Sequence, residues 1–147
     1  MAHGHLLYVE DDSSQHEIVA SVLAIEGFEV TVASSAKAAL EELATRRYAV
    51  LITDYHLADA AASWLLERGR AEGLLWGVVV VVVTGERGPV ETYGAPVFRK
   101  PIPFDALLST VRTALARRPR MHSGVRARVA APESQTKRLI SPAGRSR

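Results

Sequence analysis

Short apolar runs alternate with longer amphipathic segments along the first 118 residues, and this alternation restricts the fold more than any other feature of the chain. Apolar runs of strand length occupy residues 5–9, 28–33, 48–53, 78–83 and 95–99. Segments with helical periodicity occupy residues 13–27, 34–47, 59–73 and 103–118. Strands that alternate with helices in this way predict right-handed crossovers and a parallel sheet that helices cover on both faces, which is an α/β fold.

The pattern inside each segment predicts how it is buried. Strict alternation of Phe28, Val30 and Val32 indicates a half-buried, peripheral strand, whereas the wholly apolar run 48–53 indicates a central one. The first helix should begin with a hydroxyl N-cap and end at Gly27. The helical side chains expected to face the core are Ile18, Val19, Val22, Leu23 and Ile25 in the first helix, Leu40 and Leu43 in the second, and Phe104, Leu107, Leu108, Val111 and Leu115 in the last.

Composition excludes several classes of protein. The chain has no cysteine, which excludes disulfides and thiolate metal sites, and its five histidines do not show the spacing of zinc ligands. The longest apolar run, Val78 to Val83, is far shorter than the roughly 20 residues of a membrane helix, and the N-terminus lacks the pattern of a signal peptide. We therefore expect a cytoplasmic protein without membrane insertion.

The charges divide the chain into an acidic body and a basic tail. Residues 1–116 hold 9 Lys and Arg against 15 Asp and Glu, whereas residues 117–147 hold 9 against 1. The tail has three prolines and no sustained apolar period, so we predict a folded domain over residues 1–118 and a disordered basic tail over residues 119–147. Such a tail predicts weak contact with nucleic acid or another acidic surface.

Polar side chains follow the expected strands at the point where each strand ends. Carboxylates follow the first and third runs, a threonine ends the fourth and a lysine follows the fifth; these residues are Glu10, Asp11, Asp12, Asp54, Thr84 and Lys100. Ligands of open parallel sheets bind beyond the carboxyl ends of the strands, so these groups should converge. Clustered carboxylates repel one another and call for a cation, and Mg²⁺ prefers hard oxygen ligands while leaving room for phosphate oxygens. An aspartate beside it could act as a nucleophile and carry an acyl phosphate.

At these residues the chain resembles the receiver domain of bacterial two-component response regulators. The matching stretches are "VEDD", "LITD", "VVVTG" and "KP", in the expected order. The resemblance implies a flavodoxin-like, doubly wound, five-stranded parallel sheet with strand order 2-1-3-4-5. It also implies that Asp54 is the phosphoacceptor, that Thr84 and Lys100 bind the phosphoryl group, and that Asp12 caps the following helix. The implied Mg²⁺ ligands are Glu10, Asp11, Asp54 and the backbone carbonyl of His56.

The sequence departs from the pattern of this family between the last two strands. Only 16 positions separate Thr84 from Lys100, and the breaker-rich segment between them predicts that the fourth helix is shortened or absent. Val97 occupies the position where the family often has an aromatic switch residue. Phe98 is one position away, so its side chain should point to the opposite face of the strand. The loop after Asp54 also lacks the proline and glycine that are common there.

The leading functional hypothesis is a stand-alone response regulator that accepts a phosphoryl group on Asp54 from a histidine kinase or phosphotransfer protein. It would signal through contacts with a downstream protein that the sequence does not identify, and would catalyse only its own phosphorylation and dephosphorylation. One alternative is a receiver-like interaction module that does not depend on phosphorylation. A weaker alternative is a Mg²⁺-dependent aspartyl phosphatase, which usually has an acid at the position that His56 occupies here.

Overall fold

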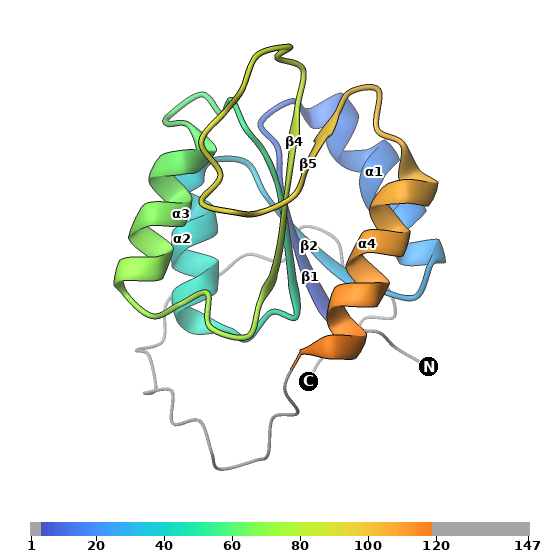
Figure 1. Ribbon diagram of the computed structural model, residues 1–147, viewed down its shortest axis with the longest axis horizontal. Helices are drawn as coiled ribbons and strands as arrows, with labels where there is room; N and C mark the ends of the chain where they lie inside the picture. The colour runs from blue at the N-terminus through green and yellow to red at the C-terminus, as the bar shows by residue number, and fades with distance from the viewer. Residues whose placement is uncertain (1–3, 119–147) are drawn as a thin grey trace.

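The computed structural model describes residues 4–118, which form one five-stranded sheet with helices on both sides (Figure 1). The strands are β1 (His5–Val9), β2 (Glu29–Ala33), β3 (Val50–Asp54), β4 (Val79–Thr84) and β5 (Val97–Arg99). The helices are α1 (Ser13–Ile25), α2 (Ala36–Thr45), α3 (Ala62–Ala71) and α4 (Phe104–Arg117). All four strand pairs are parallel and the order is β2-β1-β3-β4-β5, which confirms the predicted fold class. The predicted tail lies outside the described residues.

Two apolar cores sandwich the sheet because successive strand residues point to opposite faces. Leu6 and Tyr8 of β1 pack with α1 and α4 on one face, whereas Leu7 and Val9 pack with α2 and α3 on the other (Figure 1). Every residue of β3 is buried, so the expectation of a central strand is correct. None of the helices within residues 4–118 has the length and apolar character needed to cross a membrane.

The burial predicted for the first helix and the second strand is partly wrong. Ile18 and Ile25 are 64% and 81% exposed, because α1 turns Val19, Ala20 and Leu23 toward the sheet. At about 100° per residue, the two isoleucines fall on nearly the opposite side of the helix from that stripe. The strand β2 does lie at the edge, but it is buried on both faces rather than half-buried, since even Thr31 is inaccessible.

Side chains that accept hydrogen bonds from the first backbone N–H groups fix where the helices α1 and α2 begin. Asp12, not a hydroxyl residue, is the N-cap of α1 and accepts a hydrogen bond from Ser14 N at 3.0 Å, as the family resemblance implied. The carboxylate of Asp59 accepts from Ala36 N at 2.9 Å and from Lys37 N at 3.0 Å, so it caps α2 from a distant loop. Asp59 lies in a bend of the chain, and α3 begins at Ala62, three residues later than the sequence pattern suggested.

The connection between β4 and β5 contains the main departure from a regular α/β repeat. Of the residues that the structure describes between Gly85 and Pro96, none is helical, which confirms the prediction for this segment. Tyr93 and Gly94 have φ angles of 53° and 90°, in the left-handed region that interrupts a helix. In β5, Phe98 packs into the core shared with α1 and α4, whereas Val97 points away from it and is 36% exposed.

Candidate functional site

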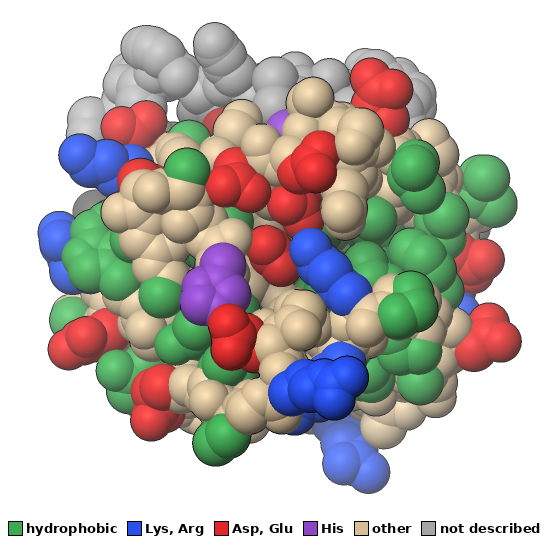
Figure 2. Space-filling view, turned by 90° about the horizontal axis from the view of Figure 1, so that it is seen from above, with side chains coloured by type: hydrophobic (Ala, Val, Ile, Leu, Met, Phe, Trp, Pro, Cys, Tyr) green, Lys and Arg blue, Asp and Glu red, His purple; other side chains and the backbone are tan. Residues whose placement is uncertain are grey.

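Charged side chains gather at the carboxyl edge of the sheet, as the sequence predicted. Glu10 directly follows β1, Asp54 and Thr84 are the last residues of β3 and β4, and Lys100 directly follows β5. Figure 2 looks down on this edge and shows carboxylates in the centre of the face, beside a cationic side chain and a histidine. Parallel strands bring these groups together although the residues are up to 90 positions apart.

Three carboxylates form the centre of the site. One oxygen of each of Glu10, Asp11 and Asp54 lies within 4.8 Å of the others. Glu10 and Asp54 are buried, whereas Asp11 is exposed and leaves one side of the cluster open to solvent. Carboxylates this close repel one another strongly unless a cation or a proton is shared among them.

Lys100 supplies a positive charge next to the two buried acids of the cluster. Its Nζ lies 3.1 Å from Asp54 Oδ1 and 3.4 Å from Glu10 Oε1, so one ammonium contacts both buried acids. Burial by itself would lower the pKa of Lys100, but the hydrogen bond to Asp54 and the charges of Asp54 and Glu10 raise it above its ordinary value. Lys100 is therefore held in the charged form beside Asp54.

The pKa values of the two buried acids, Glu10 and Asp54, remain raised in spite of this lysine. Burial, followed by the charge of Asp54, raises the pKa of Glu10. Burial also raises the pKa of Asp54, with a further contribution from Asp11, although Lys100 opposes the shift. One ammonium does not compensate three carboxylates, so the site has the electrostatic character of a cation site.

Thr84 and His56 complete the rim of the site. The buried Thr84 Oγ1 accepts a hydrogen bond from Glu86 N at 2.9 Å, which leaves the hydroxyl proton available for another acceptor. His56 is exposed, and its Nε2 lies 2.9 Å from Glu86 Oε2 across the gap between the loops that follow β3 and β4. Both side chains are about half exposed, so this pair contributes little to stability.

Three residues that contact the site residues Glu10 and His56 were not predicted from the sequence. Tyr8 OH donates to Glu10 Oε1 at 3.3 Å, and His16 Nε2 contacts the backbone oxygen of Glu10. Glu86 joins His56 across the mouth of the site. Tyr8 could have been found, because it lies two residues before Glu10 and so shares its face of the strand; the other two contacts depend on loop and helix geometry.

The donor set fits Mg²⁺, which the sequence predicted. Carboxylate oxygens are the ligands this hard cation prefers, and an exposed ligand such as Asp11 leaves space for the waters and phosphate oxygens that Mg²⁺ retains. An open parallel sheet with an acidic cluster, a lysine and a threonine at its carboxyl edge defines the class of α/β domain that binds ligands at this edge.

Comparison with known proteins identifies the family. The model for the response regulator receiver domain matches residues 6–112, and the chain belongs to this family. The described fold is similar to the receiver domain of the Francisella response regulator 1452, with a TM-score of 0.70, 21% identity, and coverage of 78% of this chain and 98% of that one. A CheY-like receiver domain from Methylobacillus flagellatus gives a TM-score of 0.68 at 24% identity, with coverage of 75% and 97%.

A curated relative supports the same assignment over a shorter stretch. The two-component response regulator ORR11 of Oryza sativa subsp. indica is 31% identical over 86 residues, which are 58% of this chain. The matched stretch spans 58% of the length of that relative. Receiver domains are signalling regulators and not classical enzymes, and the matched residues fall inside the predicted folded domain.

Magnesium should stabilise the folded protein, because it relieves repulsion among Glu10, Asp11 and Asp54. We expect the melting temperature to rise with millimolar Mg²⁺, saturably, and the rise to be largely lost in Asp11→Asn. Differential scanning fluorimetry with a chelator as the reference measures this shift. Asp12→Asn, which keeps an N-cap side chain, is the matched control and should respond like the parent chain. Equal responses of the two variants would contradict a metal site at this cluster.

Proposed function

We propose that the protein accepts a phosphoryl group on Asp54 from a phosphohistidine of a histidine kinase or phosphotransfer protein, and passes the signal on through protein contacts. The observation that carries this proposal is the placement of Lys100 Nζ 3.1 Å from Asp54 Oδ1, on an acceptor that lies beside two further carboxylates. This arrangement leaves one nucleophilic oxygen in a site suited to a cation and to phosphate.

The transfer needs a nucleophile and a set of groups that stabilise charge on phosphorus. An Asp54 oxygen forms a bond to phosphorus while the bond from phosphorus to the donor histidine nitrogen breaks. Lys100, whose Nζ lies 3.1 Å from Asp54 Oδ1, and the hydroxyl of Thr84 would hold phosphoryl oxygens as charge develops on them. Mg²⁺, held by Glu10, Asp11, Asp54 and the backbone carbonyl of His56, would supply positive charge to the same oxygens.

Two alternatives remain distinct from this proposal. A phosphorylation-independent interaction module is favoured by the absence of a helix among the described residues of the β4–β5 connection, since this segment departs from the family pattern. An aspartyl phosphatase is less well supported, because the second residue after Asp54 is a histidine, where such phosphatases usually have an acid. The side chain of this histidine, His56, contacts Glu86.

Incubation with acetyl phosphate, followed by intact-mass analysis, tests the proposal directly. We expect the mass of one phosphoryl group to be added with Mg²⁺ but not with a chelator. The addition should disappear in Asp54→Ala and persist in Asp12→Asn, whose side chain caps α1 outside the carboxylate cluster. Equal labelling of Asp54→Ala, or labelling in the chelator, would refute the assignment, and release of free phosphate from many donor molecules would favour the phosphatase.

Phosphorylation should order the loop at residues 85–96 instead of shifting a helix. Val97 has no ring to report movement of Thr84. The loop directly follows Thr84 and is joined through β5 to Lys100, and these two residues would close on the phosphoryl group. Hydrogen exchange with beryllium fluoride and Mg²⁺, a phosphoryl mimic, should therefore slow in residues 85–96 and in the loop after Asp54. The amides of β2 serve as an internal control. A response confined to α1 would show that the output surface lies elsewhere.

A further inference from the structure

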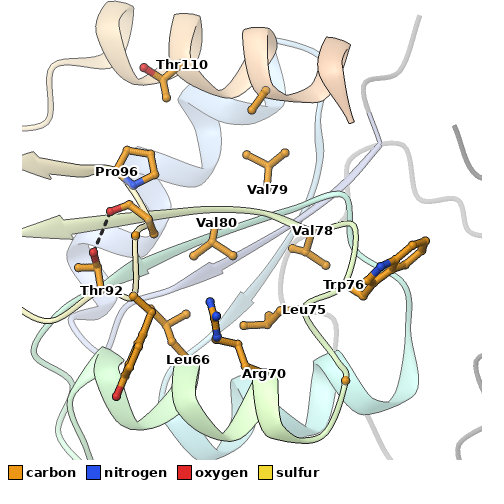
Figure 3. Close-up of a pocket in the computed structure, with 15 residues that line it drawn as sticks. Leu66, Arg70, Leu75, Trp76, Val78, Val79, Val80, Thr92, Pro96 and Thr110 are labelled. Atoms are coloured by element: carbon orange, nitrogen blue, oxygen red, sulfur yellow. Dashed lines mark hydrogen bonds between the residues drawn. The ribbon is translucent and has the colours of Figure 1, made fainter. Parts of the chain in front are cut away.

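A groove lies on the half of β4 farthest from the acidic site. It has a volume of about 710 Å³. Figure 3 shows Val78, Val79 and Val80 along its floor, Leu66 of α3 on one side and Thr110 of α4 on the other. Trp76, 63% exposed, stands at one end. The lining is mainly apolar, and Arg70 reaches into it from α3.

The groove exists because β4 is twice as long as its outer neighbour. β4 has six residues and β5 three, and β5 pairs only with Val82, Val83 and Thr84. The first half of β4 therefore has a partner strand only on the β3 side. A helix between β4 and β5 would cover this half, but none is present in the described connection, and Val78 to Val80 are only partly buried.

The uncovered half of β4 also presents backbone groups without a neighbouring strand. Val79 N donates to Ala49 O on the β3 side at 2.9 Å, whereas Val82 N donates to Pro96 O on the β5 side at 2.9 Å. Because the direction alternates along a parallel strand, the N–H and C=O of Val80 point toward the open edge. Pro96 has no N–H and cannot donate to Val80. An open edge of this kind is a template for one more strand.

The chain itself leads a suitable segment to this edge. Arg118 caps the end of α4, and its Nη1 donates to Gly77 O at 3.0 Å, beside Trp76. The described part of the chain therefore ends beside the groove, at Arg118. Six residues, 119–124, can span about 20 Å, which is enough to enter it. They are followed by the sequence VRARV at 125–129, in which valine or alanine alternates with arginine, the period of a half-buried strand.

We propose that residues 125–129 dock in this groove of the same chain as an added strand beside β4. Side chains of an added strand alternate between the two faces of the sheet, so Val125, Ala127 and Val129 would face the α3 side, where Leu66, Val78 and Val80 pack. Their backbone would pair with the N–H and C=O of Val80. Arg126 and Arg128 would face the opposite side, along α4. Glu91 Oε2 accepts a hydrogen bond at 2.8 Å from the backbone N of Tyr93, a residue that lines the groove, so an acidic group lies at its rim.

Residue-resolved amide exchange by NMR tests this docking. In the full chain, the amide of Val80 should exchange at least about tenfold more slowly than in the double variant Val125→Glu, Val129→Glu. The double variant Leu139→Glu, Ile140→Glu makes the same chemical change elsewhere in the tail and should leave Val80 protected. The amide of Val79, bonded to Ala49 O, is the internal control for an intact sheet in every sample.

Each outcome of this experiment bears on the proposal. Fast exchange at Val80 in the full chain, or equal effects of the two double variants, would overturn it. Protection that falls on dilution, together with a change from dimer to monomer in ultracentrifugation, would show that the segment comes from a second copy and would also overturn it. Because no phosphoryl donor is used, failure here would leave the proposed function of Asp54 untouched.

Discussion

Lys100→Met is expected to reduce the rate of Asp54 phosphorylation by roughly 100- to 1,000-fold, the usual effect of removing one group that stabilises charge in a transition state. The lysine lies 3.1 Å from the acceptor oxygen, and methionine keeps most of its length without its charge. Stopped-flow or time-resolved mass analysis with acetyl phosphate and saturating Mg²⁺ measures the rate. Lys37→Met, on the exposed side of α2, should be silent. Comparable rates for parent and Lys100→Met would remove the lysine from the proposed chemistry.

The same substitution should destabilise the metal-free protein. Glu10 and Asp54 would lose their shared cation while staying buried, and stranding buried charges in this way costs about 2 kcal/mol or more. Urea unfolding in a chelator measures the loss, and Mg²⁺ should restore much of it by taking over the neutralisation. Loss of activity without this loss of stability would mean that the lysine contacts only the phosphoryl group.

Asp54→Asn should have the opposite effect and raise the free energy of unfolding of the metal-free protein at neutral pH, by on the order of 1 kcal/mol. Burial and the neighbouring Asp11 raise the pKa of Asp54, and burial and Asp54 raise the pKa of Glu10, so their ionised forms disfavour the native state. Asparagine keeps the shape of the side chain and removes one of these charges. A lower stability in chelator would contradict this account.

The raised pKa values of Glu10 and Asp54 also predict how the free energy of unfolding depends on pH. Between the ordinary carboxyl pKa and the raised pKa of Glu10 and Asp54, the native state binds more protons than the unfolded state. The free energy of unfolding contributed by these groups therefore falls as pH rises through that window, and Asp54→Asn should flatten the fall. Urea titrations in chelator from mildly acidic to neutral pH measure the slope.

Asp59 serves as a control because its pKa is shifted in the opposite direction to that of Asp54. Burial is the largest single effect and raises the pKa of Asp59, but hydrogen bonds from the backbone of Ala36 and Lys37 act together to lower the pKa below its ordinary value. Its contribution to stability is present above the ordinary carboxyl pKa and is lost as pH falls through the lowered value. Asp59→Asn should therefore weaken the protein most at neutral pH, where Asp54→Asn strengthens it. Slopes of the same sign for both variants would show that the two shifts have been misassigned.

Local patterns were enough to predict a parallel α/β sheet and the convergence of the charged residues, whereas the strand order was predicted from the family resemblance. Alternating strands and helices restrict the topology, and parallel strands then carry Glu10, Asp54, Thr84 and Lys100 to one edge whatever the details of packing. The opposite orientations of Val97 and Phe98 also followed from strand periodicity alone. The functional roles of the charged residues and of Thr84 stay predictions, as does the ligation of Mg²⁺ by the His56 carbonyl.

Features that depend on packing were missed. An apolar helical face can be placed only when its neighbours are known, and for this reason the exposed Ile18 and Ile25 were assigned to the core. The edge strand β2 was expected to expose one face, but α2 covers the side that carries Ala33. The cap that Asp59 provides to α2 joins residues more than 20 positions apart, and no local pattern reports such a contact.

The loop after Asp54 is secured at both ends and in its middle. Tyr55 N donates to Val83 O, Ala62 N donates to Tyr55 O, and Asp59 holds the start of α2. Adding or deleting a residue here would detach the cap of one helix and displace the start of another. In the segment 85–96 the contacts with other elements involve Glu86, Tyr93 and Pro96, and residues 87–89 between them are exposed. An engineer who wishes to insert a reporter into this protein should therefore leave the first loop at its natural length and place the insertion in the second.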